Sequence, residues 1–138
     1  MDADPEQLPV FVYGTLRPGQ SNYGRFLHGR TAAEEPARMR GAVLYEGPGY
    51  PYAVTDPSGE IHGELISLAA AHHGAVLASL DRLEGHARGS THHYVRVERT
   101  VLPAAGGAVR AWVYLAADAL ARRLRAVGTP IPGGSWPE

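Results

Sequence analysis

The chain has 138 residues, of which 44% are hydrophobic and 20% are charged, and its formal net charge is −1. These values are typical of a soluble globular protein with one hydrophobic core. We therefore interpret residues 1–138 as a single domain, with a polar leader at residues 1–7 and a Pro/Gly-rich tail at residues 128–138.

The composition excludes several classes of chemistry. The chain has no cysteine and no lysine, so it cannot form disulfides, use a thiolate nucleophile, form a Schiff base or supply a P-loop lysine. Its arginines are scattered among acidic residues, which argues against nucleic acid as a partner. No apolar stretch is long enough to span a membrane, and the start of the chain is acidic rather than signal-like, so we expect a cytoplasmic protein.

Hydrophobic patterns predict mostly strands in the first half of the chain. In chain order we expect a buried strand at 8–13, a short helix at 23–27, a strand at 31–46 and a hairpin of strands at 52–55 and 61–68. Ser21 or Asn22 is the expected N-cap of the short helix. Pro36 must lie at an edge, at a bulge or before its strand begins, because proline has no N–H to donate. The turn residues at 56–59 would close the hairpin.

The second half alternates helices with a further hairpin. In chain order we expect a helix at 69–83, strands at 94–102 and 108–115, and a helix at about 118–127. Gly85 is a plausible C-cap for the first helix and Asp118 an N-cap for the second. Ile131 and Trp136 are expected to anchor the tail. Since hairpins dominate, we predict an α+β fold, a small mixed and mostly antiparallel β-barrel flanked by helices.

The junction after the first strand is a candidate ligand loop. The strand stops at Gly14 and continues into Thr15, Leu16 and further turn-forming residues. A strand that ends at glycine can leave successive backbone N–H groups directed into a cavity, where they bind a carboxylate. The alternative is a plain turn stabilised by two glycines and a proline.

Glu84 is the candidate acid/base residue. It follows Leu80 and Leu83, which have the spacing of a core-facing helix, so it should lie between the apolar interior and solvent. Burial at such a position raises a carboxyl pKa toward neutrality and suits it to take a proton from an amine. The alternative is a solvated glutamate at a helix end.

Other catalytic patterns are weaker. Five of the seven histidines are clustered: His72, His73, His86, His92 and His93. They do not form an HExxH motif or another ligand-like spacing, so we expect no metal site and no cofactor. No serine lies in a GxSxG elbow. The tyrosines Tyr94 and Tyr114 lie on expected strands as core or pocket wall.

Six sequence pieces in the same order resemble the γ-glutamylcyclotransferase-like superfamily. They are Val10–Gly19 (VFVYGTLRPG), Gly49–Pro51 (GYP), Ile61–Leu65 (IHGEL), Leu80–Gly85 (LDRLEG) and the pair of strand segments Tyr94–Arg96 and Ala111–Tyr114 (YVR, AWVY). The resemblance extends from about residue 9 to 136 and implies the barrel fold predicted above. Two departures are a Gly/His/Ser-rich segment at 86–93, which bears on substrate identity, and Gly134-Ser135 before Trp136, which concerns packing.

The resemblance also implies an activity and a site. Enzymes of this family cyclise a γ-glutamyl group to 5-oxoproline and release the amine. Their acid/base glutamate maps onto Glu84 and their substrate loop onto Tyr13, Gly14, Thr15 and Leu16, with Tyr94 lining the pocket. The expected partner is a small γ-glutamyl amine or peptide, and no oligomeric state is indicated. A non-catalytic module that binds an amino-acid-like ligand, or a metal-dependent hydrolase using the histidines, is the alternative.

Overall fold

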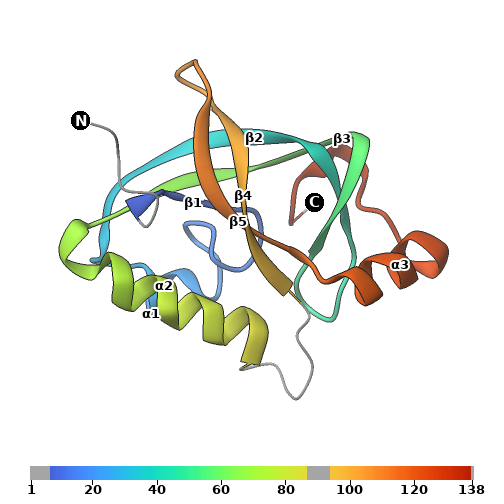
Figure 1. Cartoon of the computed structure of the whole chain (residues 1–138), viewed down its shortest axis with the longest axis horizontal. Coiled ribbons are helices and arrows are strands. Elements are labelled where there is room, and N and C mark those ends of the chain that lie inside the picture. The colour runs from blue at the N-terminus through green and yellow to red at the C-terminus, as the bar shows by residue number, and fades with distance from the viewer. Residues whose placement is uncertain (1–6, 87–93, 138) are drawn as a thin grey trace.

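Five strands form a closed barrel in the computed structural model, which describes residues 7–86 and 94–137. The strands are β1 (Val10–Val12), β2 (Thr31–Tyr45), β3 (Tyr52–Leu68), β4 (Tyr94–Pro103) and β5 (Val109–Ala116). Their order around the barrel is β1-β3-β2-β4-β5 (Figure 1). Neighbours pair antiparallel except β5 and β1, which are parallel and close the barrel where Val10 pairs with Trp112. The predicted α+β barrel is confirmed.

The longest strand pair, β2 with β3, corrects one sequence expectation. The predicted hairpin turn at residues 56–59 is wrong, because β3 runs through it as one strand. Ala42 pairs with Thr55 and Arg40 with Glu60, so residues 56–59 bulge out opposite a single residue of β2. Asp56 satisfies this bulge locally by accepting hydrogen bonds from the N–H and the hydroxyl of Ser58. Asp56 and Ser58 thus form the local hydrogen bonds expected of a turn. The chain nevertheless does not reverse, because β3 pairs with β2 on both sides of the bulge.

Pro36 lies inside β2 rather than before it. It is opposite Glu64 of β3, and its carbonyl accepts a hydrogen bond from the N–H of Ala104, just past β4. Strand β4 meets β2 only at Ala37 and Arg38, directly after the proline. Pro36 thus occupies a margin of the sheet where a missing N–H is tolerated.

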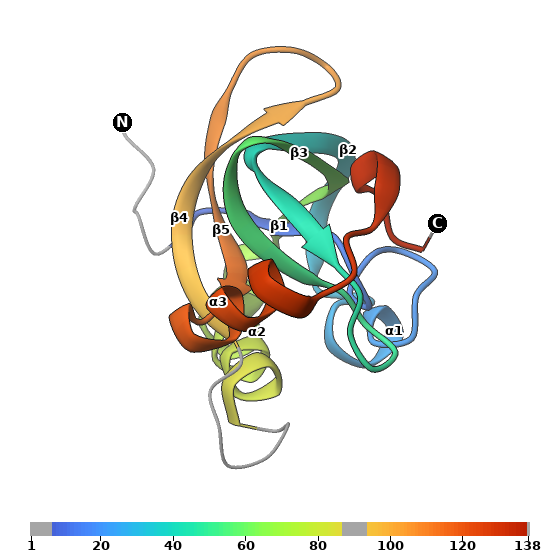
Figure 2. The same cartoon turned by 90° about the vertical axis from the view of Figure 1, so that its right-hand side faces the viewer.

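Three α-helices flank the barrel: α1 (Tyr23–Phe26), α2 (His73–Asp81) and α3 (Asp118–Val127). Helices α1 and α2 lie together on one side of it, and α3 lies apart from α1 across the molecule (Figures 1 and 2). Short 3-10 turns precede α2 (Ala70–His72) and follow α3 (Pro132–Gly134), and a π-helical turn (Arg82–His86) extends α2. No helix in the described ranges is long and apolar enough to cross a bilayer.

The helix ends differ in detail from the prediction. Asn22 is the N-cap residue of α1, but its side chain donates to the Thr15 hydroxyl instead of capping the helix. Asp118 is the first residue of α3, and Ala117 occupies the N-cap position. Gly85 does not end the helix that precedes it, because the π-helical turn includes it.

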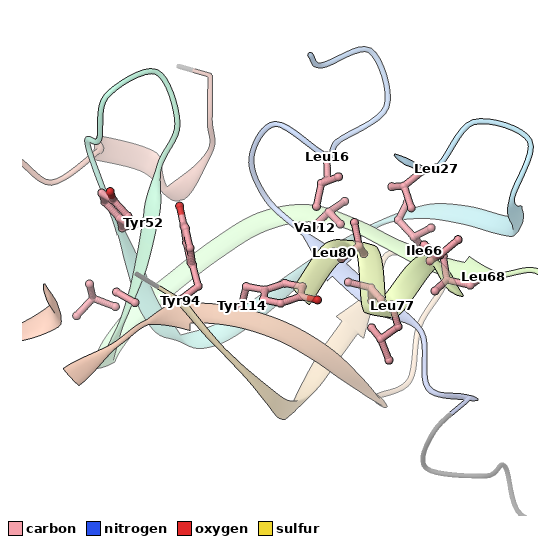
Figure 3. Packing of buried hydrophobic residues seen from close by; sticks show 14 of the residues in the cluster. Val12, Leu16, Leu27, Tyr52, Ile66, Leu68, Leu77, Leu80, Tyr94 and Tyr114 are labelled. Carbon is pink, nitrogen blue, oxygen red and sulfur yellow. The ribbon is translucent and has the colours of Figure 1, made fainter. Parts of the chain in front are cut away.

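Both faces of β1 are buried, which places its end between two hydrophobic clusters. Val10 and Val12 pack in the cluster that includes Leu80 of α2, as Figure 3 shows for Val12 and Leu80. Phe11 alternates to the opposite face and packs in the barrel interior, in the cluster that Ile131 joins. A residue that follows β1 therefore emerges in the interior of the molecule, close to the end of α2.

Candidate active site

A cleft opens where β1 ends, with about 360 Å³ of unfilled space including its mouth. Its walls come from β1 and the following loop, the β2–β3 loop, the π turn after α2, and strands β4 and β5. The lining residues are Phe11, Val12, Tyr13, Gly14, Thr15, Leu16, Tyr50, Pro51, Glu84, Tyr94 and Tyr114. The structure thus brings together all six residues that the sequence analysis singled out, from three distant parts of the chain.

The loop after β1 forms one wall and presents its backbone to the cleft. Residues 14–17 make a turn in which the N–H of Arg17 donates to the carbonyl of Gly14 at 3.0 Å. Asn22 makes two hydrogen bonds to Thr15. Its backbone N–H donates to the Thr15 carbonyl at 2.8 Å, and its side-chain amide donates to the Thr15 hydroxyl at 2.9 Å. Among the turn and loop hydrogen bonds of the described residues, none runs from the backbone N–H groups of residues 14–16 to a backbone carbonyl. This arrangement suits an anionic group such as a carboxylate.

Glycine at position 14 allows close packing against Pro51. A Cβ added there would lie 3.0 Å from Cδ and 3.1 Å from Cγ of Pro51. Pro51 is itself fully buried, and its ring would have to shift by a few tenths of an ångström to accept a Cβ there. Gly14 therefore lets the two loops that line the cleft approach each other closely.

Arg17 ties the same loop to β3 and to the C-terminal tail. Its guanidinium donates two hydrogen bonds to Glu64, at 2.7 and 3.0 Å, and one to the backbone carbonyl of Trp136 at 2.6 Å. The side chains of Arg17 and Glu64 are only 20% and 19% exposed, so this forked pair is partly shielded from water. The C-terminal tail therefore supports the loop after β1 through this hydrogen bond, in addition to the packing role expected for Trp136.

Glu84 reaches the cleft from the π turn that follows α2. It is only 7% exposed, and Leu80 one turn earlier is fully buried. The widened π-helical turn rotates the chain relative to a regular helix, and such turns are frequent at functional sites. Glu84 therefore contributes a buried carboxylate to the same cleft that the loop at residues 13–16 lines.

The negative charge of Glu84 is one of the causes that raise the pKa of two tyrosines, Tyr13 and Tyr114. Burial raises the pKa of the Tyr13 phenol well above its usual 10.0, and the negative charge of Glu84 raises it further. Burial and the hydrogen bond to Asp81 are the main causes that raise the pKa of Tyr114, and Glu84 adds to the same direction. Both phenols therefore remain protonated at neutral pH, as neutral hydrogen-bond donors. The hydroxyl of Tyr13 donates to the backbone carbonyl of Tyr114.

Tyr94 fixes the opposite wall. It is 6% exposed, and its hydroxyl donates to the carbonyl of Pro51 at 2.8 Å. Its ring lies 5.3 Å from that of Tyr52, which in turn meets Tyr50 at 5.5 Å edge-on. Figure 3 shows Tyr52 and Tyr94 as neighbouring side chains. The β2–β3 loop is thus held against β4 by aromatic packing and one buried hydrogen bond.

Some residues of the cleft wall were not predicted from the sequence. Phe11, Pro51 and Tyr114 were not named as substrate contacts, although Tyr114 was considered as pocket wall from its strand position. The described residues contain no group of three or more His, Asp or Glu side chains placed to hold a metal ion. The segment at 87–93, with His92 and His93, lies outside the described residues.

Comparison with known proteins identifies the family of the chain. The chain matches the sequence profile of the family described as "Gamma-glutamyl cyclotransferase, AIG2-like" over residues 10–138. Among curated proteins no match was found.

Solved structures share the fold over most of the chain. A protein from Arabidopsis thaliana is 30% identical, with 84% of this chain and 66% of that chain covered and a TM-score of 0.60. An uncharacterised protein from Pyrococcus horikoshii is 22% identical over 94% and 89% of the two chains, with a TM-score of 0.63. An AIG2-like protein from Mus musculus is 24% identical over 80% and 77%, with a TM-score of 0.58. Since the profile match spans almost the whole chain, this protein belongs to the gamma-glutamyl cyclotransferase, AIG2-like family.

Proposed function

We propose that the cleft is an active site that cyclises the γ-glutamyl group of a small γ-glutamyl amine or peptide to 5-oxoproline and releases the free amine. One observation carries the proposal: the carboxylate of Glu84, 7% exposed, lines the same cleft as the loop at residues 13–16. This observation supports a role for Glu84 as proton acceptor and for the loop backbone as the binding site of a substrate carboxylate. Membership of the family supports the same reaction class.

The loop and the tyrosines orient the substrate in this mechanism. The backbone N–H groups of residues 14–16 bind the α-carboxylate of the glutamyl head, which leaves the α-ammonium directed toward Glu84. The far wall, with Tyr50 and Tyr94, contacts the γ-linked amine. Because nucleophile and electrophile belong to one molecule, holding the reactive conformer accounts for a large part of the acceleration, up to about 7–11 kcal/mol in well-oriented intramolecular reactions.

Glu84 moves the proton. A free α-amine has a pKa near 8, so at neutral pH it is mostly an ammonium ion and unreactive. Glu84 removes one proton, the amine nitrogen attacks the γ-carbonyl carbon, and a five-membered ring closes. After the attack the ring nitrogen carries two hydrogens and a positive charge, and it loses one of these protons to solvent. The carboxyl group of Glu84, now protonated, gives its proton to the leaving nitrogen as the C–N bond breaks. The products are 5-oxoproline and an amine, with no covalent enzyme intermediate and no cofactor. We expect this reaction to take place in the cytoplasm.

The test replaces Glu84 by Gln, which keeps the shape of the side chain and removes its basicity. With γ-glutamyl amines and peptides as substrates, we expect 5-oxoproline release to fall by about 10²–10⁴-fold, the usual contribution of a general acid/base. Glu98→Gln is the matched control, since Glu98 pairs with Arg110 on the exposed face of the β4–β5 hairpin. Circular dichroism confirms that both variants fold.

Three outcomes would contradict parts of the proposal. Unchanged turnover in folded Glu84→Gln would exclude the acid/base role. Thermal stabilisation of the wild-type protein by γ-glutamyl compounds, without product, would instead identify a binding module. Cleavage of α-linked glutamyl amides at a similar rate would refute ring closure, because the α-amine of these isomers cannot close a comparable ring onto the scissile carbonyl.

A further inference from the structure

The last residue of α2, Asp81, is bonded to two strands of the barrel at once. The guanidinium of Arg96 in β4 donates to both carboxylate oxygens, at 2.8 and 3.3 Å. The hydroxyl of Tyr114 in β5 donates to one of the same oxygens at 2.7 Å. A single carboxylate thus joins the C-terminal end of a helix to two neighbouring strands.

This network is continuous with the wall of the cleft. Arg96 and Tyr114 face each other in the β4–β5 register, and the guanidinium stacks over the ring of Trp112 at 4.3 Å. The stacking holds the fork of Arg96 in the orientation that a bidentate carboxylate contact needs. Tyr114 itself lines the cleft, and its backbone carbonyl accepts the hydroxyl of Tyr13. The Asp81 contacts therefore end at the surface that substrate would touch.

The π turn with Glu84 begins at the residue after Asp81. Such π-helical turns are rare and occur mostly as single turns within α-helices. Leu80, fully buried, fixes the helix from the core side. Asp81 fixes it from the strand side. Since Glu84 follows three residues later, a small rotation of the helix end would move its carboxylate relative to the loop at residues 13–16.

From this arrangement we infer that Asp81 is a positioning residue for Glu84, acting through Arg96 and Tyr114; the inference rests on the proposed function. Its role is geometric rather than a general contribution to stability. The side chain of Asp81 is 41% exposed and that of Arg96 27%, and ion pairs so open to water add little to the free energy of unfolding. Misplacement of a catalytic group by about 1 Å, in contrast, costs on the order of 10²-fold in rate.

The test compares Asp81→Asn with two references. Asn keeps the shape and an oxygen that accepts from Tyr114, but it loses the charge that binds Arg96. We expect kcat to fall at least about tenfold while KM changes less than about twofold, and the melting temperature to stay close to that of the wild type. The control is Glu98→Gln, which breaks another arginine–carboxylate pair of the same hairpin. In that pair Nε of Arg110 lies 2.7 Å from a carboxylate oxygen of Glu98, and its loss should leave kcat unchanged.

A double variant separates positioning from other effects. In the Glu84→Gln background, Asp81→Asn should reduce the residual turnover less than about twofold, because its effect passes through Glu84. Equal losses in both backgrounds would overturn the inference. So would a rise in KM alone, or a loss of kcat no larger than in Glu98→Gln.

Hydrogen exchange gives a readout that does not depend on activity. Asp81→Asn should speed amide exchange at residues 82–86, while exchange in β3 stays as in the wild type. If the wild-type protein released no 5-oxoproline, the proposed function would fail, and exchange would still decide whether Asp81 holds the turn. Unchanged exchange at residues 82–86 would overturn the inference in either case.

Discussion

Replacement of Gly63 by Ala should disrupt the contact on which the substrate loop depends. Gly63 is a buried residue of β3 and precedes Glu64, the residue that pairs with Val12 of β1. A Cβ at this position would lie 2.0 Å from the carbonyl oxygen of Val12, 3.0 Å from its carbonyl carbon and 3.1 Å from the ring of Phe11. Side-chain carbons do not approach a backbone oxygen so closely, so β1 would have to retreat by about 1 Å.

The expected cost follows from this displacement. Overpacking a well-packed interior costs typically about 1–3 kcal/mol. For a chain of this length we expect a fall in melting temperature of roughly 3–10 °C. Because Val12 directly precedes the loop at residues 13–16, the same shift should raise KM for γ-glutamyl substrates.

The measurement is urea unfolding followed by circular dichroism, together with a thermal scan. The matched control is Gly74→Ala, a glycine to alanine change in α2 where the added Cβ has no atom within 4 Å. That variant should be neutral or more stable by up to about 1 kcal/mol, because alanine favours the helix. A Gly63→Ala protein as stable as the wild type, with unchanged KM, would refute the claim that close approach of the strands sets this position.

Two further predictions concern the supports of the cleft. Arg17→Met removes the forked pair with Glu64 and the bond to the carbonyl of Trp136, so we expect a loss of about 1–3 kcal/mol and a higher KM, measured by denaturation and steady-state kinetics. For Tyr13 and Tyr114, the pKa is raised in the folded state, so above pH 10 the unfolded chain ionises first. Stability should therefore be intact below pH 10 and fall above it, by up to about 1.4 kcal/mol per pH unit for each phenol.

Each of these has its own control. Arg38→Met breaks an exposed pair with Glu60, in which the side chains are 42% and 38% exposed, and should cost less than about 1 kcal/mol. An equal loss in both arginine variants would show that the Arg17 network is not special. Tyr13→Phe should flatten the decline in stability above pH 10, and an unchanged slope would contradict the assignment of that decline to buried phenols.

Local pattern was enough for much of the fold. Alternation of residues predicted the β4–β5 hairpin, and helical spacing predicted α2 with Leu80 in the core. The expected turn at residues 56–59 failed for a physical reason. Asp56 and Ser58 do form the local hydrogen bonds of a turn, but pairing of β3 with β2 on both sides outweighs that preference. The sequence also predicted that the helix ends at Gly85, whereas the π turn runs to His86 and includes the buried Glu84.

For the candidate active site, the sequence indicated which residues take part, and the structure showed which residues surround them. Gly14 and Glu84 were recognised through their motifs, since a glycine after a buried strand and a glutamate after core leucines have distinctive local signatures. Tyr114 and Asp81 have no such signature. Their importance lies in a hydrogen bond that joins positions 33 residues apart.

The sequence by itself determined the absence of cysteine and lysine chemistry, the strand and helix content and the glycine that ends β1, because these depend on residue identity and short-range pattern. Only the tertiary structure decided that Glu84 is enclosed with the loop at residues 13–16. Closure of the barrel through β5 and β1, and the packing of Leu80 against Val12, bring the two segments together. Such contacts depend on the simultaneous fit of many side chains, which no single segment encodes.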